Sequence, residues 1–526
     1  MGSRLAWAAT GIAAAAVAVG VGEVVAGVFG STSAIAAVGA LVIALQPPGA
    51  KDFMVGLFGT NDKLALEVGV FIGGLLVGAL IGLAGGRDRR FAYGGFALLG
   101  IVGLVLILQD PLEDAFAGLI TVAAAVGAGV ATFQWLASML VAAPAPAPAP
   151  AVRAARRSAS NPPPAPRIGA SIPRRAFLVI AATFVAVGAV LSVIGRFLGS
   201  QTPTTSAAQI PVPSPGATVA PPPSGASFDI AGITPIITPD DDFYIIDTRL
   251  STPRVDATTW SLRIHGMVDR EVTLDYQQLI AMPLTEQYVT IQCVSNEVGG
   301  TLVGNAKWTG VNLNSVLDMA GVQPGATQLV GTSFDGWTSG FPTAHLQGAG
   351  KDAMIVVQMN DAPLPARHGY PARLIVPGLY GYVSATKWII DIELTTLEAI
   401  DGYWVRLGWA KEGPILTQSR IDVPRSGQSV PAGAVEFAGV AWAPTREISK
   451  VEVDLDLTGN WQPCELSVPL SDYTWVQWRT TLQVPAGQHS IRVRATDGTG
   501  AVQEQGPTPP APDGARGWMT VGFNAS

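Results

Sequence analysis

The chain has 526 residues, of which 48% are hydrophobic and 13% charged, and its formal net charge is −7. This length exceeds that of a single domain, and with this weakly acidic balance we expect no nucleic-acid partner. The apolar residues are concentrated in the first 200 positions, so the two parts of the chain are treated separately.

Five uncharged runs in the first part are long enough to cross a bilayer as helices. A further apolar run, 24–50, is interrupted by Gly30 and by the turn-forming Pro47-Pro48-Gly49 sequence. We predict that it is a re-entrant or surface segment, with a sixth spanning helix as the alternative. The five predicted spans are 5–22, 68–86, 91–109, 115–143 and 176–195.

Positively charged loops indicate the orientation of these spans. The loop 87–90 holds three arginines and the segment 144–175 holds six with no acidic residue, whereas the loop 110–114 is acidic. Because basic loops stay in the cytoplasm, five crossings with the N-terminus inside put everything after residue 198 outside. Six crossings would require the N-terminus outside.

The segment before the last span carries two further features. Its APAPAPAPA repeat is typical of an extended spacer, and it ends in the sequence IPRRAFLVIAA, which contains Arg174 and Arg175. One interpretation is a simple positively charged anchor. The other is a twin-arginine export signal within the chain, which would mean that the outer part crosses the membrane already folded.

All four histidines lie in the second part of the chain, at positions 265, 345, 368 and 489. The membrane helices therefore offer no pair of histidines for a haem. We expect no haem in this chain, and we expect electrons to pass to a separate cytochrome or quinone-linked protein.

The second part divides by composition. Residues 199–238 are rich in Pro, Ser, Thr and Ala, which predicts a flexible linker, and folded structure is expected from about Pro239. Segments 239–420 mix short strands and helices around many Gly and Pro turns, as in an α+β domain. Residues 421–526 show strands with alternating apolar and charged residues, which favours an immunoglobulin-like β-sandwich.

Cys293 and Cys464 are the only cysteines. A disulfide between them is one interpretation, and burial of each as a small apolar residue is another. Cys293, however, ends an alternating strand and enters the turn-like sequence SNEVGG. Since an unpaired thiol outside the cell is open to oxidation, this position also suggests a metal ligand or a reactive group.

Four segments in order resemble the sulfite oxidase family of molybdenum enzymes: QCVSNEVGG, NAKWTGVNLNSVL, SFDGWTSGFP and MNDAPLPARHGYPARLIVPGLYGYVSATKW. The resemblance covers about 240–526 and excludes the membrane region. It implies a molybdenum–molybdopterin cofactor, with Cys293 as the metal ligand, and two-electron oxo transfer on a small-molecule substrate. A homodimer through the C-terminal domain is compatible with it.

The same resemblance implies the site residues. Trp308 and Tyr403 match aromatic residues near the substrate, and Cys293 is catalytic as well as metal-binding. The implied cofactor-binding residues are Tyr244, Ile245, Ile246, Asp247, Thr248, Cys293, Asp335, His368, Arg373, Ala385, Thr386 and Lys387.

The chain also departs from the family pattern. Val298 and Ile246 stand where sulfite-oxidising members place arginines that hold an anionic substrate, although Arg249, Lys307 or Arg406 could replace them. We therefore expect a membrane-anchored enzyme that is sulfite oxidase-like, with a sulfoxide reductase as the alternative within the family. An envelope scaffold that has lost the cofactor is the alternative outside it.

Overall fold

The computed structural model describes residues 4–45, 54, 57–58, 62–110, 113–140, 173–201, 210–246, 248–250 and 252–526. The chain forms two compact units, one made of the helices before residue 203 together with the short stretch 249–251, and one made of the remainder. Each unit is described by itself. The Pro-rich and Arg-rich residues 144–172 lie outside the described residues.

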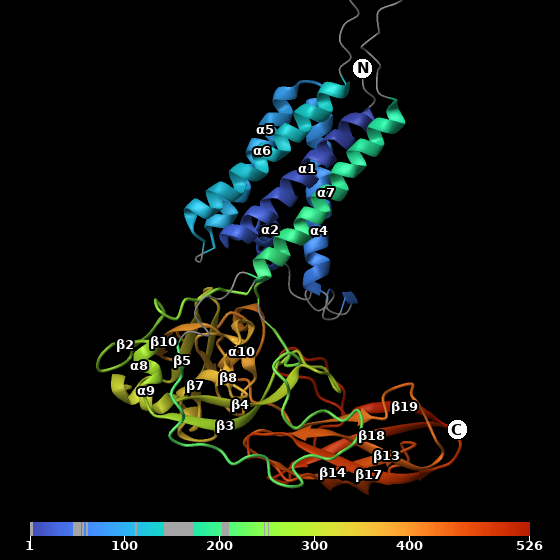
Figure 1. Ribbon diagram of the computed structural model, residues 1–526. Helices are drawn as coiled ribbons and strands as arrows, with labels where there is room; N and C mark the ends of the chain where they lie inside the picture. The colour runs from blue at the N-terminus through green and yellow to red at the C-terminus, as the bar shows by residue number, and fades with distance from the viewer. Residues whose placement is uncertain are drawn as a thin grey trace, which may run out of the picture. The chain divides into compact units, whose positions relative to one another are not determined.

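The first unit is entirely helical (Figure 1). Five of its described helices are long and apolar enough to cross a membrane, in agreement with the five predicted spans. The sixth, α2, has 12 residues and lies within the interrupted run 24–50. The helices are α1 (Arg4–Phe29), α2 (Ala34–Leu45), α4 (Asp62–Gly85), α5 (Arg89–Leu108), α6 (Ala115–Leu140) and α7 (Arg174–Gln201).

Helix α1 is longer than the predicted span 5–22, because it continues through Glu23. That side chain is buried within the unit, 3.8 Å from Arg196 of α7, so its charge does not end the helix. Glycines let the neighbours approach α1 closely. A Cβ on Gly11 would lie 1.9 Å from the Gly78 carbonyl oxygen of α4, and one on Gly27 would lie 2.2 Å from the Gly195 carbonyl oxygen of α7.

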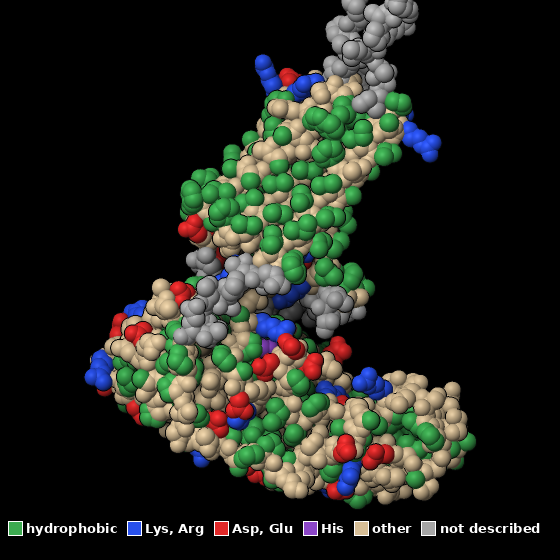
Figure 2. All heavy atoms as spheres, in the orientation of Figure 1, with side chains coloured by type: hydrophobic (Ala, Val, Ile, Leu, Met, Phe, Trp, Pro, Cys, Tyr) green, Lys and Arg blue, Asp and Glu red, His purple; other side chains and the backbone are tan. Residues whose placement is uncertain are grey.

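The outward faces of these helices are apolar. Figure 2 shows hydrophobic side chains covering the displayed face of the helical unit, with charged side chains gathered toward its ends. Such a surface fits a lipid environment better than water. The most exposed of these side chains include Leu76, Leu80, Leu98, Ile101, Phe116, Val193 and Phe197, each more than 60% exposed.

Two sheets form the first half of the second unit. One is antiparallel and contains β3 (Leu284–Gln292), β4 (Val303–Asn312), β7 (Met354–Met359), β8 (Ala362–Pro363) and β9 (Arg373–Ile375), which pairs with β7. The other has the order β2 (Val272–Asp275), β1 (Ser261–Gly266), β10 (Ile389–Thr395), β5 (Gln328–Ser333) and β6 (Thr338–Pro342), with only β1 and β10 parallel.

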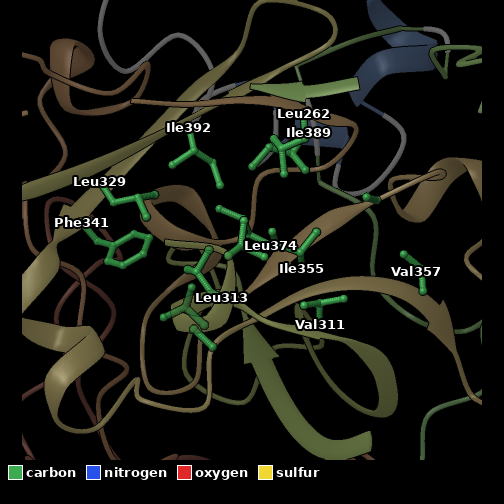
Figure 3. Close-up of a cluster of buried hydrophobic side chains, with 14 of the residues drawn as sticks. Leu262, Val311, Leu313, Leu329, Phe341, Ile355, Val357, Leu374, Ile389 and Ile392 are labelled. Carbon is green, nitrogen blue, oxygen red and sulfur yellow. The ribbon is translucent and has the colours of Figure 1, made fainter. Parts of the chain in front are cut away.

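A hydrophobic core holds these two sheets and their helices together. It includes Leu262, Val311, Leu329, Leu374 and Ile389, all with no exposed surface (Figure 3). The short helices are α8 (Tyr276–Ile280), α9 (Leu313–Ala320), α10 (Gly381–Ser384), η2 (Thr343–Gln347), η3 (Ala366–His368) and η4 (Val405–Leu407). This mixture agrees with the predicted α+β domain.

The C-terminal part consists of strands alone, as predicted. One sheet has the order β11 (Gln418–Val423), β13 (Gly433–Trp442), β17 (Val476–Val484) and β16 (Glu465–Leu466). The other has the order β12 (Ser429–Val430), β19 (Thr520–Ala525), β18 (Gly487–Asp497), β14 (Ile448–Leu455) and β15 (Gln462–Pro463). Their apolar residues, among them Phe437, Trp478 and Val493, form one core. An immunoglobulin-like classification remains a prediction.

Two predicted boundaries need correction. Residues 210–238 are not a free linker, because their backbone groups bind partners in the folded unit. The Phe228 amide donates to Gln477 Oε1 at 2.7 Å and the Thr234 amide donates to Asp422 at 3.0 Å. The predicted border between 420 and 421 falls inside β11, and both sides of it belong to the same compact unit.

Candidate active site

Cys293 lies at the end of β3, in the loop that joins it to β4. Its amide donates to the Leu302 carbonyl at 2.9 Å, and the Asn296 amide donates back to the Cys293 carbonyl at 3.0 Å. Asn296 Oδ1 accepts from the Leu302 amide at 2.8 Å. These bonds fix a tight loop, the cysteine loop (residues 293–302), on a rigid antiparallel pair. The cysteine side chain is 8% exposed.

The cysteine loop depends on a glycine next to the C-terminal strands. Gly299 has φ +75°, and a Cβ there would lie 2.8 Å from Met519 Sδ. A side chain at this position would therefore combine backbone strain with a steric clash. This close approach explains the glycine at position 299.

The structure brings Tyr244 close to Cys293. Burial, with a contribution from the Cys293 charge, raises the pKa of Tyr244 far above its ordinary value, while Arg373 opposes the rise. A Cβ built on Gly381, the first residue of α10, would lie 3.9 Å from the Tyr244 hydroxyl and 3.5 Å from the Ala385 Cβ. Tyr244 therefore lies near Cys293, near Arg373 and near the start of α10.

Arg373 is a buried cation without an acidic partner among the described residues. It is 4% exposed; its Nη1 donates to the His368 carbonyl at 3.0 Å, and its Nε has no hydrogen-bond partner there. Burial lowers its pKa to about 10, so it stays charged at neutral pH. An unmatched buried charge is costly, and the orphaned Nε fits an anionic group such as the phosphate of a pterin cofactor.

His368 is neutral at physiological pH. Its Nε2 lies 3.0 Å from the Asp240 carbonyl oxygen, which can only accept, so Nε2 carries the proton. Burial lowers the pKa of His368 to about 4, with the charge of Arg373 among the smaller causes. Nδ1 is thus unprotonated. Toward a cofactor, this nitrogen can therefore only accept a hydrogen bond.

Two further predicted residues, Lys387 and Thr386, are held in place by hydrogen bonds. The Trp388 amide donates to the Gly369 carbonyl at 3.2 Å, and Lys387 Nζ donates to the Arg367 carbonyl at 3.3 Å. Gly369 has φ +113°, and a Cβ there would lie 3.0 Å from Lys387 Cα. Thr386 is fully buried, with its hydroxyl 2.6 Å from that of Ser339.

Trp308, which was predicted to lie near the substrate, is buried in this structure. Its side chain has no exposed surface, and its Nε1 donates to the Val289 carbonyl at 3.1 Å. Phe243 packs edge-on against it at 5.7 Å between ring centroids, and the Arg373 guanidinium lies 5.3 Å from its ring. Trp308 therefore packs against the Arg373 guanidinium on one side and against Phe243 on another.

Other predicted residues lie in the same domain without a described contact to Cys293. Asp335 caps the β5–β6 turn by accepting from the Trp337 amide at 3.2 Å. Tyr403 packs edge-on against Trp404 and bonds Thr338 through its backbone. Ile245 is exposed and Ile246 and Thr248 are half-buried, whereas Asp247 lies outside the described residues.

Residues of the segment between β18 and β19 lie near the same site, and sequence reasoning missed them. Burial raises the pKa of Tyr380 to about 12, and the charges of Arg516, Asp513 and Cys293 act on the same phenol. Arg516 donates to both Asp513 oxygens, at 2.8 and 2.9 Å, and to Glu504 at 3.2 Å. A Cβ on the next residue, Gly517, would lie 3.3 Å from Val298. Only the conspicuous Arg-Gly-Trp sequence at 516–518 could have signalled this contribution.

Both cysteines are free, so the interpretation of a Cys293–Cys464 disulfide is wrong for this structure. Cys464 packs against the core of the C-terminal strands. Burial there raises the pKa of its thiol to about 12, which keeps it protonated and unreactive.

Comparisons with known proteins identify the family of the domain that contains Cys293. Residues 249–404 match the family model described as the oxidoreductase molybdopterin binding domain. The chain is 28% identical over 303 residues to mitochondrial sulfite oxidase of Homo sapiens, a match that covers 49% of this chain and 55% of that one. It therefore spans about half the length of this curated relative.

Two further similarities were found. An uncharacterized oxidoreductase of Bacillus subtilis, YuiH, is 31% identical over 158 residues, which cover 30% of this chain and 76% of the relative. The crystal structure of the sulfane dehydrogenase SoxCD from Paracoccus pantotrophus aligns with a TM-score of 0.47 and 21% identity, over 56% of this chain and 84% of that one.

Proposed function

Because this chain belongs to the sulfite oxidase family of molybdopterin oxidoreductases, we propose that it is a membrane-anchored oxo-transfer enzyme whose active site faces away from the cytoplasm. The observation that carries the site assignment is the buried Arg373, which has an unpartnered Nε and whose charge, like that of Cys293, acts on Tyr244. This cation needs an anion, and the cysteine can supply a thiolate to a metal.

Each of the proposed cofactor-binding residues would contact a different part of the cofactor. Cys293, on a loop that the three hydrogen bonds described above hold in place, would be the protein ligand of molybdenum. Arg373 would bind an anionic part of the pterin, with Lys387 as a second cation beside it, and His368 would accept a hydrogen bond through Nδ1. When bound, the cofactor supplies transfer of an oxo group together with two electrons.

Substrate charge is the second part of the proposal. Val298 and Ile246 offer no charge, and of the three alternative cations two are already paired and the third is exposed. Lys307 is paired with Asp361 and with Glu286 at 3.4 Å, Arg249 donates to Asp110 at 3.2 Å within the helical unit, and Arg406 is exposed.

Arg516 is the remaining cation near Tyr380, and two carboxylates already balance it. A doubly charged anion in a site of low water access requires cations that are not already neutralised. We therefore propose a neutral or singly charged substrate, such as a sulfoxide, in preference to sulfite. Sulfite oxidation is the second candidate, favoured by the relatives named above.

The membrane arrangement rests on the five apolar helices and on the arginine-rich loops. With the N-terminus in the cytoplasm, the second unit would lie outside, and electrons would pass to a separate redox protein.

Steady-state kinetics with an artificial electron carrier tests the substrate proposal. The purified full-length protein should turn over small sulfoxides faster, by kcat/KM, than sulfite. A sulfite KM in the low micromolar range, within the usual enzyme span of about 1 μM to 1 mM, together with inactivity on sulfoxides, would show that other residues supply the missing charge.

A further inference from the structure

Ser295 is the nearest hydrogen-bonding side chain to the proposed metal ligand. Its hydroxyl oxygen lies 2.9 Å from Cys293 Sγ, and the residue is half-buried. The two residues are the first and third of a four-residue turn, which the bond from the Asn296 amide to the Cys293 carbonyl closes at 3.0 Å. The turn therefore directs the Ser295 hydroxyl toward the Cys293 sulfur.

The direction of this hydrogen bond follows from the state of the sulfur. In a thiol either atom could donate, but a thiolate has no proton and can only accept. Once Cys293 binds a metal as a thiolate, the Ser295 hydroxyl must be the donor. In the described part of the chain this hydroxyl has no other hydrogen-bond partner, so nothing there competes for its proton.

Tyr244 does not provide the same bond. Its hydroxyl is close enough for the Cys293 charge to raise its pKa, but no hydrogen bond joins the two side chains among the described residues. The Cys293 and Asn296 amides of the cysteine loop donate to the carbonyls of Leu302 and Cys293, and not to the sulfur. Ser295 is thus the donor that the geometry assigns to the sulfur.

We propose that Ser295 is a positioning residue that sets the reduction potential of the metal centre through an O–H···S bond to Cys293. The inference rests on the proposed function, since it requires Cys293 to bind molybdenum. A hydrogen bond draws charge from the sulfur and weakens its donation to the metal. The lower oxidation level of the centre is then favoured, and the reduction potential rises.

The test is a redox titration of the full-length holoprotein, followed by the molybdenum EPR signal. Ser295→Ala should shift the midpoint potential to more negative values, and Ser295→Thr should restore it. Ser295→Val has the shape of the threonine variant without its hydroxyl, so its potential should match that of the alanine variant. Ser449→Ala removes the hydroxyl of an exposed serine, which bonds backbone carbonyls in β18, and should leave the potential unchanged.

The outcomes separate this inference from the proposed function. If the wild-type protein holds no molybdenum, or holds it without Cys293, the proposed function fails. If molybdenum is bound through Cys293 and the threonine and valine variants have equal potentials, only the role of Ser295 is overturned. If Ser295→Thr and Ser295→Val lose metal to the same extent, the size of the side chain matters and its hydroxyl does not. This result would also overturn the inference.

Discussion

The guanidinium of Arg420, on the first C-terminal strand, donates to the carbonyl oxygen of Gly300 in the cysteine loop at 2.8 Å. The same side chain donates to Asp422 at 2.8 Å and to Thr234 at 2.6 Å, and it is 6% exposed. One buried arginine thus ties together the cysteine loop, the β11 strand and the segment that precedes the α+β domain.

Loss of Arg420 should destabilise the second unit. Arg420→Met leaves the buried Asp422 carboxylate without its cation, which costs about 3 kcal/mol, and it frees the Gly300 carbonyl. We expect an earlier denaturant midpoint by tryptophan fluorescence. Arg479→Met is the matched control, because its partner Glu465 is on the surface, and it should change the midpoint little. Equal midpoints for the Arg420 variant and the wild type would refute the assignment.

His368 should make the fold sensitive to acid. Its pKa is about 4 in the folded protein and about 6.5 in an unfolded chain. Above pH 6.5 both states are neutral. As the pH falls toward 4 the unfolded state binds a proton first, so stability declines by about 2 to 3 kcal/mol.

The corresponding variant isolates this effect. His368→Gln can keep the bond to the Asp240 carbonyl but cannot titrate. Its free energy of unfolding should fall less steeply between pH 6.5 and 4 than that of the wild type. Parallel pH profiles for the two proteins would contradict the assigned burial of a neutral histidine.

The twin-arginine hypothesis concerns Arg174 and Arg175 at the start of α7. Replacing both with lysine keeps the positive charge, so a simple anchor would still orient correctly. An export signal that reads the arginine pair would fail, and the second unit would stay inside the cell. Protease accessibility of the outer part in intact cells measures this. Unchanged accessibility of the double-lysine variant would contradict the export-signal hypothesis and would support the simple anchor.

Asp513 should control the preference for substrate charge. Asp513→Asn removes one of the two carboxylates that balance Arg516 and so exposes its charge toward the site. Sulfite affinity should improve by about fivefold, which corresponds to roughly 1 kcal/mol. Sulfoxide kinetics should change less. Glu504→Gln alters the more exposed partner and should have a smaller effect. No change in the sulfite KM of the Asp513 variant would place Arg516 away from the substrate.

The sequence predicted those features that depend on local pattern. The five spans follow from the length of the apolar runs. Gly369 and Arg373 lie in one short sequence block, HGYPAR, and the positive φ of Gly369 explains why a glycine stands there. The roles of Arg420 and Arg516 could not be predicted, because each acts on residues more than 100 positions away along the chain. The complete burial of Trp308 could not be predicted for a related reason, since burial depends on what packs around a strand and not on the strand's own residues.

The central claim is that Cys293 supplies a sulfur ligand to molybdenum in this chain. X-ray absorption at the molybdenum edge of the full-length protein tests it most directly, with Cys293→Ser compared with the wild type and with Cys464→Ser. We predict molybdenum in all three proteins and one sulfur neighbour fewer in the Cys293 variant alone. An unchanged number of sulfur neighbours in that variant, or a wild-type protein without molybdenum, would contradict the account.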